Sequence, residues 1–497
     1  MVRPFFAIIP VALFLALATS HCIRSGLELD DSGYIALRVA DNLRQGNGTV
    51  FNPGERRDLV DSPLWLGLLA IASSSREAPM VLQLAGLVFG AGVLIVVLAA
   101  PRKPVAGACA SLFLGLDGLF AARATSGTSG LLAAGYLVGL YAVTRWARSR
   151  PEDEPPPDGI LAGWTAAAAV VRYELVLVAL PVALVWGLSQ WRRLHAWLPL
   201  VVASLGAALC LYVRSAYFGA LPAYWEPWPP SASGMQSGAA ILAGYVLRRP
   251  LLVLGACVVV ASALRRRFLP GRDAGIGLGV VALGGFALLP CAGQDIERQF
   301  VVLLPLIYLL AVESVWRATR ARLGLVVALL LVAAQPAWTW SARTELPESR
   351  AAYARLGQWL GAHAIPGTLV GARQVGALGY YSGLVVVDAL GQVSPQVAVA
   401  RRLQAPTPYA VAALDFAAML RQEPDLVLVA PSEPIPSSTL YVPNRDAIPP
   451  ALRGSFGIYR WAGSPVWKQA GDPAAAGVVR TRPRPAKATS AAFVPSP

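Results

Sequence analysis

The chain has 497 residues, of which 56% are hydrophobic and 14% are charged, and its mean hydropathy is +0.54. A soluble domain carries about 25% charged residues, so this composition excludes a purely soluble protein. The net charge of +14 would suit a nucleic-acid-binding protein, but most Lys and Arg lie in short turns between apolar runs. That distribution is typical of the cytoplasmic turns of a membrane protein, so we expect no nucleic-acid partner.

Long apolar runs recur from Phe5 to Trp340. A helix needs roughly 20 apolar residues to cross ~30 Å of hydrocarbon. We predict about eleven spans, at residues 5–23, 79–100, 104–121, 128–146, 158–171, 174–190, 196–216, 239–263, 274–291, 299–316 and 323–340. The first run also has features of a cleaved signal peptide, but we favour an uncleaved span. The expected location is the inner or plasma membrane, with membrane lipids as partners.

The segment Ser62–Ser74 is apolar over only about 13 residues, which is too short for a comfortable span. If it lies at the membrane interface, all the basic turns fall on the cytoplasmic side, from Arg102 and Lys103 onward. Counted as a span, it would break that rule for the turns up to Arg150. We therefore predict an interfacial helix, which leaves residues 24–78 as the first extracytoplasmic loop.

The C-terminal part of the chain has a different composition and hydropathy pattern. A helical stretch near Glu348–His363 precedes three apolar β-branched runs at residues 368–370, 384–387 and 425–429. This alternation predicts a small extracytoplasmic α/β domain over residues 341–469. Ala, Pro and Arg dominate the last residues, 470–497, so we expect that segment to be disordered. The predicted fold class is thus an all-α polytopic membrane domain, residues 1–340, followed by this domain.

Two adjacent acids, Asp30 and Asp31, come just after the first span. Paired carboxylates at a membrane boundary are costly to desolvate without a partner or a function. One of them would serve as a general base for an attacking hydroxyl, or the two would hold a divalent cation such as Mg²⁺ or Ca²⁺. The alternative is an acidic helix start exposed to solvent, because acids favour helix N-termini. The sequence makes no certain cofactor prediction.

Several outer turns carry arginines that would suit a phosphate. Arg172 and Glu174 lie between two apolar runs, where Arg172 would either bind an anionic phosphate or form an interfacial ion pair. Arg248 and Arg249 lie near the outer end of the span 239–263, where they would hold a lipid phosphate or extend to the interface.

Two further outer segments carry polar or aromatic candidates. Asp295 and Arg298 belong to a charged outer turn. Tyr217 and Trp225 belong to an aromatic-rich segment that would form an interfacial belt or stack on a sugar or isoprenoid.

The first outer loop has a long and specific motif order. It consists of Asp30-Asp31, Tyr34, Arg38, Ala40, Asn42-Leu43, Gly46, Gly48, Phe51-Asn52-Pro53-Gly54-Glu55 and Ser62-Pro63-Leu64-Trp65. This order resembles the GT-C superfamily of membrane glycosyltransferases, in the branch of the cell-wall terminal arabinofuranosyltransferase and its uncharacterised bacterial relatives. The pattern of that branch is roughly DDAYI-FRYA-NL-GHG-VFNPGER followed by an S/T-PLW helix.

Later pieces resemble the same family in order, so that the likeness spans about residues 5–430. They are Thr125-Ser126-Gly127, Val171-Arg172-Tyr173-Glu174, Tyr217-Phe218-Gly219 with Pro222, Asp295 and Arg298 with Phe300 and Pro305, and Gly376–Ser382 with Val387–Gly391. The resemblance implies an inverting transferase whose donor is a sugar on a polyprenyl phosphate. The acceptor it implies is a glycan, lipid or protein of the cell envelope, and the branch suggests a pentosyl residue such as arabinofuranosyl.

The resemblance also assigns roles to residues. Asp30 or Asp31 would be the general base, and which of them remains open, because registration on Tyr34 brings only Asp31 onto a family Asp. Arg172 or Arg298 would face the donor phosphate. The substrate-binding candidates are Tyr34, Arg38, Asn52, Glu55, Glu174, Tyr217, Trp225 and Asp295.

Two other function classes compete with a transferase. A transporter of envelope precursors predicts charges buried near the midplane and two repeated halves. Here the polar clusters fall at one edge of the predicted bundle, and the sequence shows no repeat. A non-catalytic membrane scaffold predicts that Asp30 and Asp31 can both be replaced by Asn without effect.

Overall fold

A computed structural model gives the structure of this protein. It describes residues 5–219, 296–318, 347–397, 418–429, 441–443 and 457–461 and the isolated residues 243 and 247, with short gaps at 25–26, 74–76, 102–103, 151–153 and 155. The predicted spans 239–263, 274–291 and 323–340 lie outside these residues, apart from the two isolated positions, and so does the predicted disordered segment 470–497.

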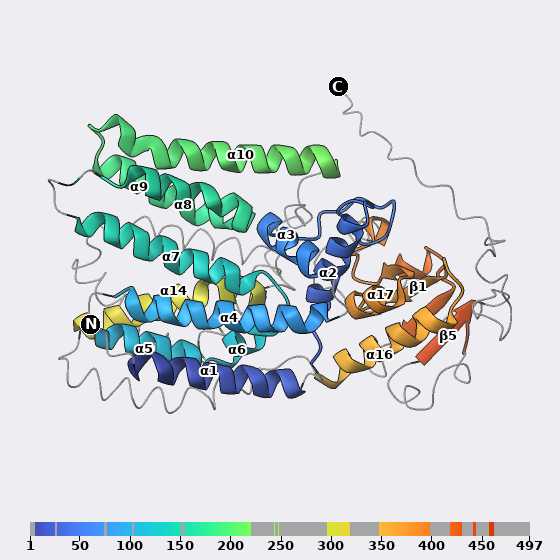
Figure 1. Ribbon diagram of the computed structural model, residues 1–497. Helices are drawn as coiled ribbons and strands as arrows, with labels where there is room; N and C mark the ends of the chain where they lie inside the picture. The colour runs from blue at the N-terminus through green and yellow to red at the C-terminus, as the bar shows by residue number, and fades with distance from the viewer. Residues whose placement is uncertain are drawn as a thin grey trace, which may run out of the picture.

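The first part of the chain is a bundle of apolar helices, most of which run along one common direction (Figure 1). They are α1 (Phe5–Arg24), α4 (Ala78–Ala99), α5 (Pro104–Gly115), α6 (Gly118–Ala124), α7 (Gly130–Ser149), α8 (Asp158–Val171), α9 (Val176–Ser189), α10 (Leu198–Phe218) and α14 (Ile296–Ala318). Single turns of 3-10 helix, η1 (Tyr173–Leu175) and η2 (Leu194–Trp197), precede α9 and α10. All of these helices fall in runs from which the sequence predicted spans.

Length and composition alone qualify two helices of the described part to cross a membrane, Ala78–Ala99 and Leu194–Phe218. A third span is added if the bent pair α5 and α6 counts as one. The predicted number of about eleven is therefore not established by these helices. The remaining helices do not meet the combined criteria of length, hydropathy and charge, and the described core packs them against one another.

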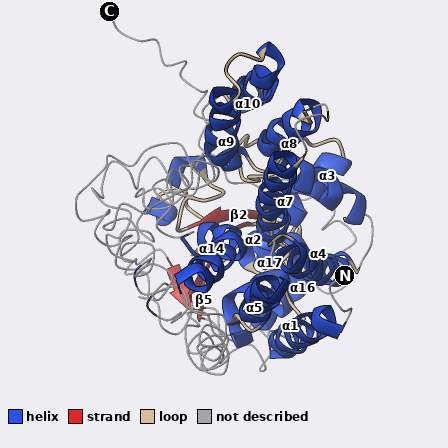
Figure 2. Ribbon diagram, turned by 90° about the vertical axis from the view of Figure 1, so that its left-hand side faces the viewer, coloured by secondary structure: helices blue, strands red, loops and turns tan. Residues whose placement is uncertain are grey.

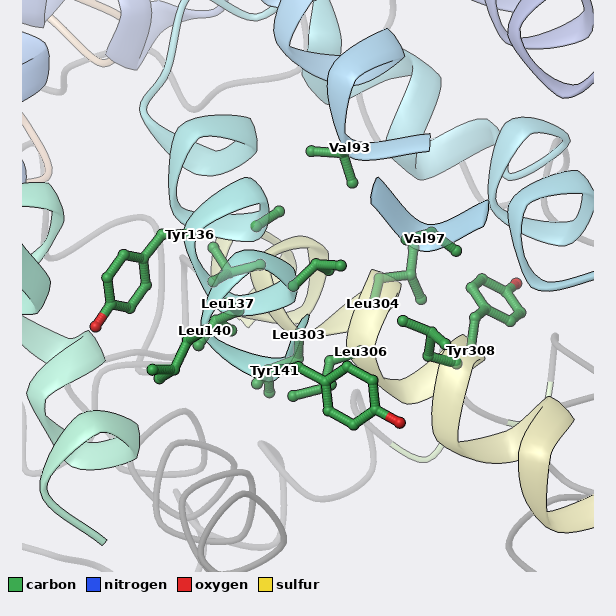
Figure 3. Close-up of a cluster of buried hydrophobic side chains, with 14 of the residues drawn as sticks. Val93, Val97, Tyr136, Leu137, Leu140, Tyr141, Leu303, Leu304, Leu306 and Tyr308 are labelled. Atoms are coloured by element: carbon green, nitrogen blue, oxygen red, sulfur yellow. The ribbon is translucent and has the colours of Figure 1, made fainter. Parts of the chain in front are cut away.

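The bundle core is built around α7, which packs against both α4 and α14 (Figure 2). Figure 3 shows Val93 and Val97 of α4, Leu137 and Tyr141 of α7, and Leu304 of α14 within this core. Glycines let other helices approach closely, because a Cβ on Gly107 would lie 2.1 Å from the carbonyl oxygen of Leu98. Small residues at helix contacts are typical of membrane bundles, in which close backbone packing supplies the attraction.

One predicted span, 104–121, proves to be broken. The axes of α5 and α6 differ by 69°, and the break lies at Asp117. The Oδ1 atom of Asp117 accepts hydrogen bonds from the backbone N–H groups of Leu119 and Phe120, at 2.9 and 3.2 Å. Asp117 therefore starts a new helix where hydropathy alone predicted a continuous one.

Two helices follow α1 and lie between the bundle and the C-terminal sheet: α2 (Asp31–Arg44) and α3 (Pro63–Ala72) (Figure 1). The prediction that Ser62–Ser74 forms one short helix agrees with α3, which has ten residues. The hydroxyl of Ser62 accepts the N–H of Trp65 at 3.0 Å and so begins the helix.

The C-terminal part contains α16 (Pro347–His363), α17 (Gly376–Ser382) and a five-stranded sheet with the order β2-β1-β3-β5-β4. The strands are β1 (Leu369–Ala372), β2 (Val385–Asp388), β3 (Leu426–Val429), β4 (Tyr441–Pro443) and β5 (Gly457–Trp461). Strand β1 is parallel to β2 and β3, whereas β5 is antiparallel to β3 and β4. The predicted helix and the three predicted strands are thus present, within a mixed sheet.

The first outer loop and this sheet share one hydrophobic core. It joins Tyr34 and Leu37 of α2 to Leu356 of α16 and Leu378 of α17, all of which are buried. Helix α2 therefore packs against the C-terminal part as well as following the first span in sequence. The boundaries 1–340 and 341–469 stay a prediction.

Candidate functional site

The candidate site is built around Asp30, which directly precedes α2 and is 5% exposed. Its Oδ2 atom lies 2.7 Å from Nη1 of Arg123, near the end of α6. Its Oδ1 atom lies 2.6 Å from Nη1 of Arg350, in the first turn of α16. A buried carboxylate is costly unless it is paired, and here two arginines from opposite ends of the sequence pair it.

Backbone hydrogen bonds also fix the position of Asp30. Its N–H donates to the carbonyl oxygen of Ser126 at 3.2 Å, and its own carbonyl accepts the N–H groups of Gly33 and Tyr34. Gly33 has no room for a side chain, because a Cβ there would lie 2.3 Å from the Ser126 oxygen. The start of α2 is thus tied to the turn between α6 and α7.

Asp31 has different surroundings, although it is the next residue. Its side chain is half-buried, and Oδ1 accepts the backbone N–H of Gly376 at 2.6 Å, at the start of α17. Two arginines thus contact Asp30 and a backbone N–H contacts Asp31, and a cation at these two acids stays a prediction. Within the described ranges, no group of three or more His, Cys, Asp or Glu side chains is placed to hold a metal ion.

Tyr34 belongs to a polar cluster beside these acids. Its hydroxyl donates to Glu28 and lies 3.1 Å from the hydroxyl of Tyr381. Burial raises the pKa of the Glu28 carboxyl above its usual value and raises the pKa of Tyr381 to about 12. Tyr34 was predicted from the sequence as a substrate-binding residue, whereas Glu28 was not predicted, although it lies only two residues before Asp30.

Three other predicted substrate-binding residues tie the first outer loop to the sheet or to itself. The guanidinium of Arg38 donates to the carbonyl oxygens of Phe51 and Leu384, at 2.8 and 2.6 Å. The amide of Asn52 exchanges two hydrogen bonds with the backbone of Val386 and donates a third to Glu55. The structure thus places Arg38 and Asn52 in an interface between loop and sheet, where both bond to the backbone of the sheet. Among the described residues, Nη1 of Arg38 is buried without a hydrogen-bond partner.

A second cluster surrounds Arg172, at the joint between α8 and α9. Its Nε lies 2.6 Å from Oε1 of Glu174, and its Nη2 lies 3.0 Å from Oδ2 of Asp61. Arg172 is 3% exposed, and Ser129 donates to the other oxygen of Asp61 at 2.8 Å. In this arrangement a phosphate would reach Arg172 only by displacing one of its two carboxylates.

Arg214 adds an ion pair close to this cluster. It contacts both carboxylate oxygens of Asp58, donates to the carbonyl of Val60 at 2.9 Å and lies over the ring of Tyr173. Sequence reasoning missed Asp58 and Arg214, although an arginine inside an apolar run was a usable signal. It also missed Arg123 and Arg350, because the sequence around each of them has the ordinary composition of a turn or a helix.

An apolar cavity opens beside the second cluster, between α8, α9 and α10. It is lined by Ala169, Tyr173, Val176, Leu177, Ala207, Cys210 and Leu211. Its lining offers space for hydrocarbon next to the buried charges.

Tyr217, at the end of α10, is exposed and contacts the first outer loop. Its hydroxyl accepts the N–H of Thr49 at 3.1 Å, and the guanidinium of Arg56 lies over its ring. The candidates Trp225, Arg248, Arg249 and Asp295 lie outside the described residues. Arg298 belongs to α14, whose first four residues are described only as helix backbone.

Comparisons with known proteins fit this arrangement. The terminal beta-(1->2)-arabinofuranosyltransferase of Corynebacterium glutamicum is 27% identical in an alignment 358 residues long, which covers 63% of this chain and 51% of that protein. The alignment therefore spans about half the length of this relative. A family described as a domain of unknown function (DUF8728) matches residues 341–475.

Two solved structures of ArnT from Cupriavidus metallidurans resemble the chain over most of its length. The structure bound to undecaprenyl phosphate matches with a TM-score of 0.55 and 17% identity, over 91% of this chain and 98% of that one. The apo structure matches with a TM-score of 0.52 and 16% identity, over 90% and 97%. These matches establish that the fold is shared.

Proposed function

We propose, from the premise that this chain has the fold of the GT-C membrane glycosyltransferases, that it is itself a glycosyltransferase with a polyprenyl-phosphate-linked sugar as donor. The acceptor is a glycan, lipid or protein of the cell envelope. Transfer takes place on the extracytoplasmic side with inversion at the anomeric carbon. A pentosyl donor such as a lipid-linked arabinofuranose is the first substrate to test, because the curated relative transfers that sugar.

The observation that carries the proposal is the position of Asp30. A buried acid lies where the first outer loop, the turn after α6 and α16 converge, and it is held by two arginines. The shared fold supports a lipid-linked donor, because a protein with this fold has been solved with undecaprenyl phosphate bound. The acids precede and begin α2, at the end of the bundle at which Figure 1 places α2 and α16.

The reaction needs a base and a cation. An acceptor hydroxyl attacks the anomeric carbon from the face opposite the phosphate, and the bond from that carbon to the phosphate oxygen breaks. A carboxylate takes the hydroxyl proton, and the bonding electrons leave with the polyprenyl phosphate. Because the leaving group is an anion, an arginine beside it lowers the barrier more than an acid would.

We assign the base to Asp30 or Asp31, and the phosphate contact to Arg172 or Arg298. Arg172 is engaged with Glu174 and Asp61, so donor binding at this residue would exchange one carboxylate for a phosphate. The apolar cavity beside Tyr173 would then receive the first part of the lipid chain. The scheme assigns no step to a metal.

The orientation of the site is part of the proposal. Basic turns between the helices support an outward-facing first loop, by the rule that cytoplasmic turns carry the excess of Lys and Arg. Labelling of single cysteines placed at residues 45–57 by an impermeant reagent on intact cells tests it. Protection of these positions in intact cells, with labelling only after permeabilisation, would refute the extracytoplasmic transferase.

Replacement of Asp30 or Asp31 by Asn tests the catalytic assignment. The variant that lacks the base should transfer at least ~100-fold more slowly, because Asn has a similar shape but accepts no proton. The measurement is sugar transfer from a polyprenyl-phosphate donor by purified protein in lipid. Asp41→Asn is the matched control, because Asp41 is on the same helix and pairs with Arg44 at the surface. Normal turnover in both Asp30→Asn and Asp31→Asn would remove the assignment of the base to these two acids.

A further inference from the structure

Arg350 connects the C-terminal part of the chain to the candidate catalytic acid. It lies 320 positions after Asp30 in sequence, yet its Nη1 is 2.6 Å from Oδ1 of that acid. The side chains are 12% and 8% exposed, so the pair is largely removed from water. A guanidinium buried this far needs its carboxylate, and a contact of this kind is far more sensitive to truncation than a surface pair.

The two arginines hold Asp30 from two independent parts of the fold. Arg123 comes from the helical bundle and contacts Oδ2, whereas Arg350 comes from α16 and contacts Oδ1. Arg123 donates a hydrogen bond to Oδ2, whereas Arg350 forms an ion pair with Oδ1 that lacks hydrogen-bond geometry. The two cations thus restrain the carboxylate from two sides.

The C-terminal part also contacts the neighbouring acid. The backbone N–H of Gly376, at the start of α17, donates to Asp31. A Cβ on Gly376 would lie 2.0 Å from the carbonyl oxygen of Asp31, so α17 presses directly on this backbone. Helices α16 and α17 thus meet the two acids at the start of α2.

We propose that Arg350 is a positioning residue for transfer, which holds the Asp30 carboxylate in its reactive orientation. The inference rests on the proposed function. It gives the C-terminal part a role in chemistry: this part supplies one of the two cations that set the geometry of an acid located in the first outer loop. Positioning of a reactive group contributes to the rate of the chemical step and much less to substrate affinity.

The test compares Arg350→Gln, Arg350→Lys and the control Arg355→Gln in purified protein with a lipid-linked sugar donor. Arg355 is exposed, lies little more than one turn further along α16 and donates to the carbonyl oxygen of Ala351 in the same helix. Arg350→Gln should lower kcat by about 10- to 100-fold and leave the donor KM within about 2-fold. Arg350→Lys should recover a large part of the rate, and Arg355→Gln should equal the unaltered protein.

Two activity results would overturn the inference. One is an unchanged kcat in Arg350→Gln. The other is an equal loss in the Lys and Gln variants together with a fall in thermal midpoint, because this would indicate lost structure in place of lost positioning.

A second readout separates this inference from the proposed function. Thermal midpoints of Asp30→Asn, Arg350→Gln and the double variant form a cycle, in which an interacting pair loses less in the double variant than the sum of the single losses. Additive losses would overturn the inference whatever the activity. A protein that is inactive with every lipid-linked sugar would refute the proposed transferase activity, and the proposed role of Arg350 in that activity would fall with it. If the cycle were still non-additive, the contact between Arg350 and Asp30 would have a structural role only.

Discussion

Glu28 is half-buried at the edge of the candidate site and accepts a hydrogen bond from Tyr34. Desolvation raises the pKa of its carboxyl, and the bonds from Tyr34 and Tyr381 offset only part of that effect. The preceding residue, Leu27, has a φ of 63°, in the left-handed region that few non-glycine residues adopt. The strained backbone at Leu27 comes directly before the desolvated acid Glu28, so the surrounding structure must hold this segment in place.

The raised pKa predicts a direction for stability against pH. The folded protein binds the Glu28 proton more tightly than the unfolded chain, whose carboxyl titrates near 4.5. Stability from this proton is complete below about pH 4.5 and is lost as pH rises through the native pKa. Glu28→Gln should therefore gain thermal stability relative to the unaltered protein at pH 7, and gain less at pH 4.5. Melting curves of both proteins at the two pH values check this, and a difference that does not grow with pH would contradict it.

Single residues mark how far sequence reasoning reaches. Asp30, Arg38 and Asn52 were predicted as site residues, because charged and amide side chains recur there in a specific motif order. The sequence did not reveal that Arg38 and Asn52 bond to Leu384 and Val386, over 300 positions away. A side chain's partner across such a distance depends on tertiary packing, which no local pattern encodes. The same reason hid Arg350.

Helix breaks are harder to predict than helices. The run 104–121 has the hydropathy of a span, yet Asp117 ends one helix and starts the next. The sequence signal for the break was an acid followed by Gly within an apolar run. The structure shows that this acid, Asp117, is buried. Hydropathy averages over a window and so gives a single acid little weight, whereas one helix cap is enough to redirect the chain. The short helix α3 was predicted better, because its length alone excluded a span.

Removal of the Asp117 cap tests how the break is held. The second oxygen of Asp117 accepts the hydroxyl of Tyr308 at 2.9 Å, so the residue joins α6 to α14. Asp117→Ala should destabilise the protein by about 1–3 kcal/mol, since two backbone donors and a buried hydroxyl lose their acceptor. Asp117→Asn should cost less, because Asn caps helices well. Denaturation in detergent measures both, and an Ala variant within ~0.5 kcal/mol of the unaltered protein would show that other contacts hold the break.

At the scale of the molecule, the C-terminal strands were predictable and their arrangement was not. Apolar β-branched runs predicted β1, β2 and β3. In the structure, the four residues of β3 are all buried. The short strand β4 ends in a proline and carries no comparable run, so it was missed. Nor did the sequence reveal that α17 packs on α2, which places the first outer loop and the sheet in one core.

That shared core predicts that the first outer loop and the C-terminal sheet lose structure together. Leu378 of α17 is fully buried within it, and Leu378→Ala should cost about 2–5 kcal/mol. Hydrogen exchange should then become faster in α2 and in β2 alike, because each loses packing against the same helix. Met419→Ala is the matched control, since Met419 is equally buried but belongs to a separate cluster with Val427 and Tyr459. It should speed exchange in the sheet and leave α2 nearly unchanged. Faster exchange in β2 alone after Leu378→Ala would mean that the two parts open independently, and that Arg350 can leave Asp30 without disturbing the loop.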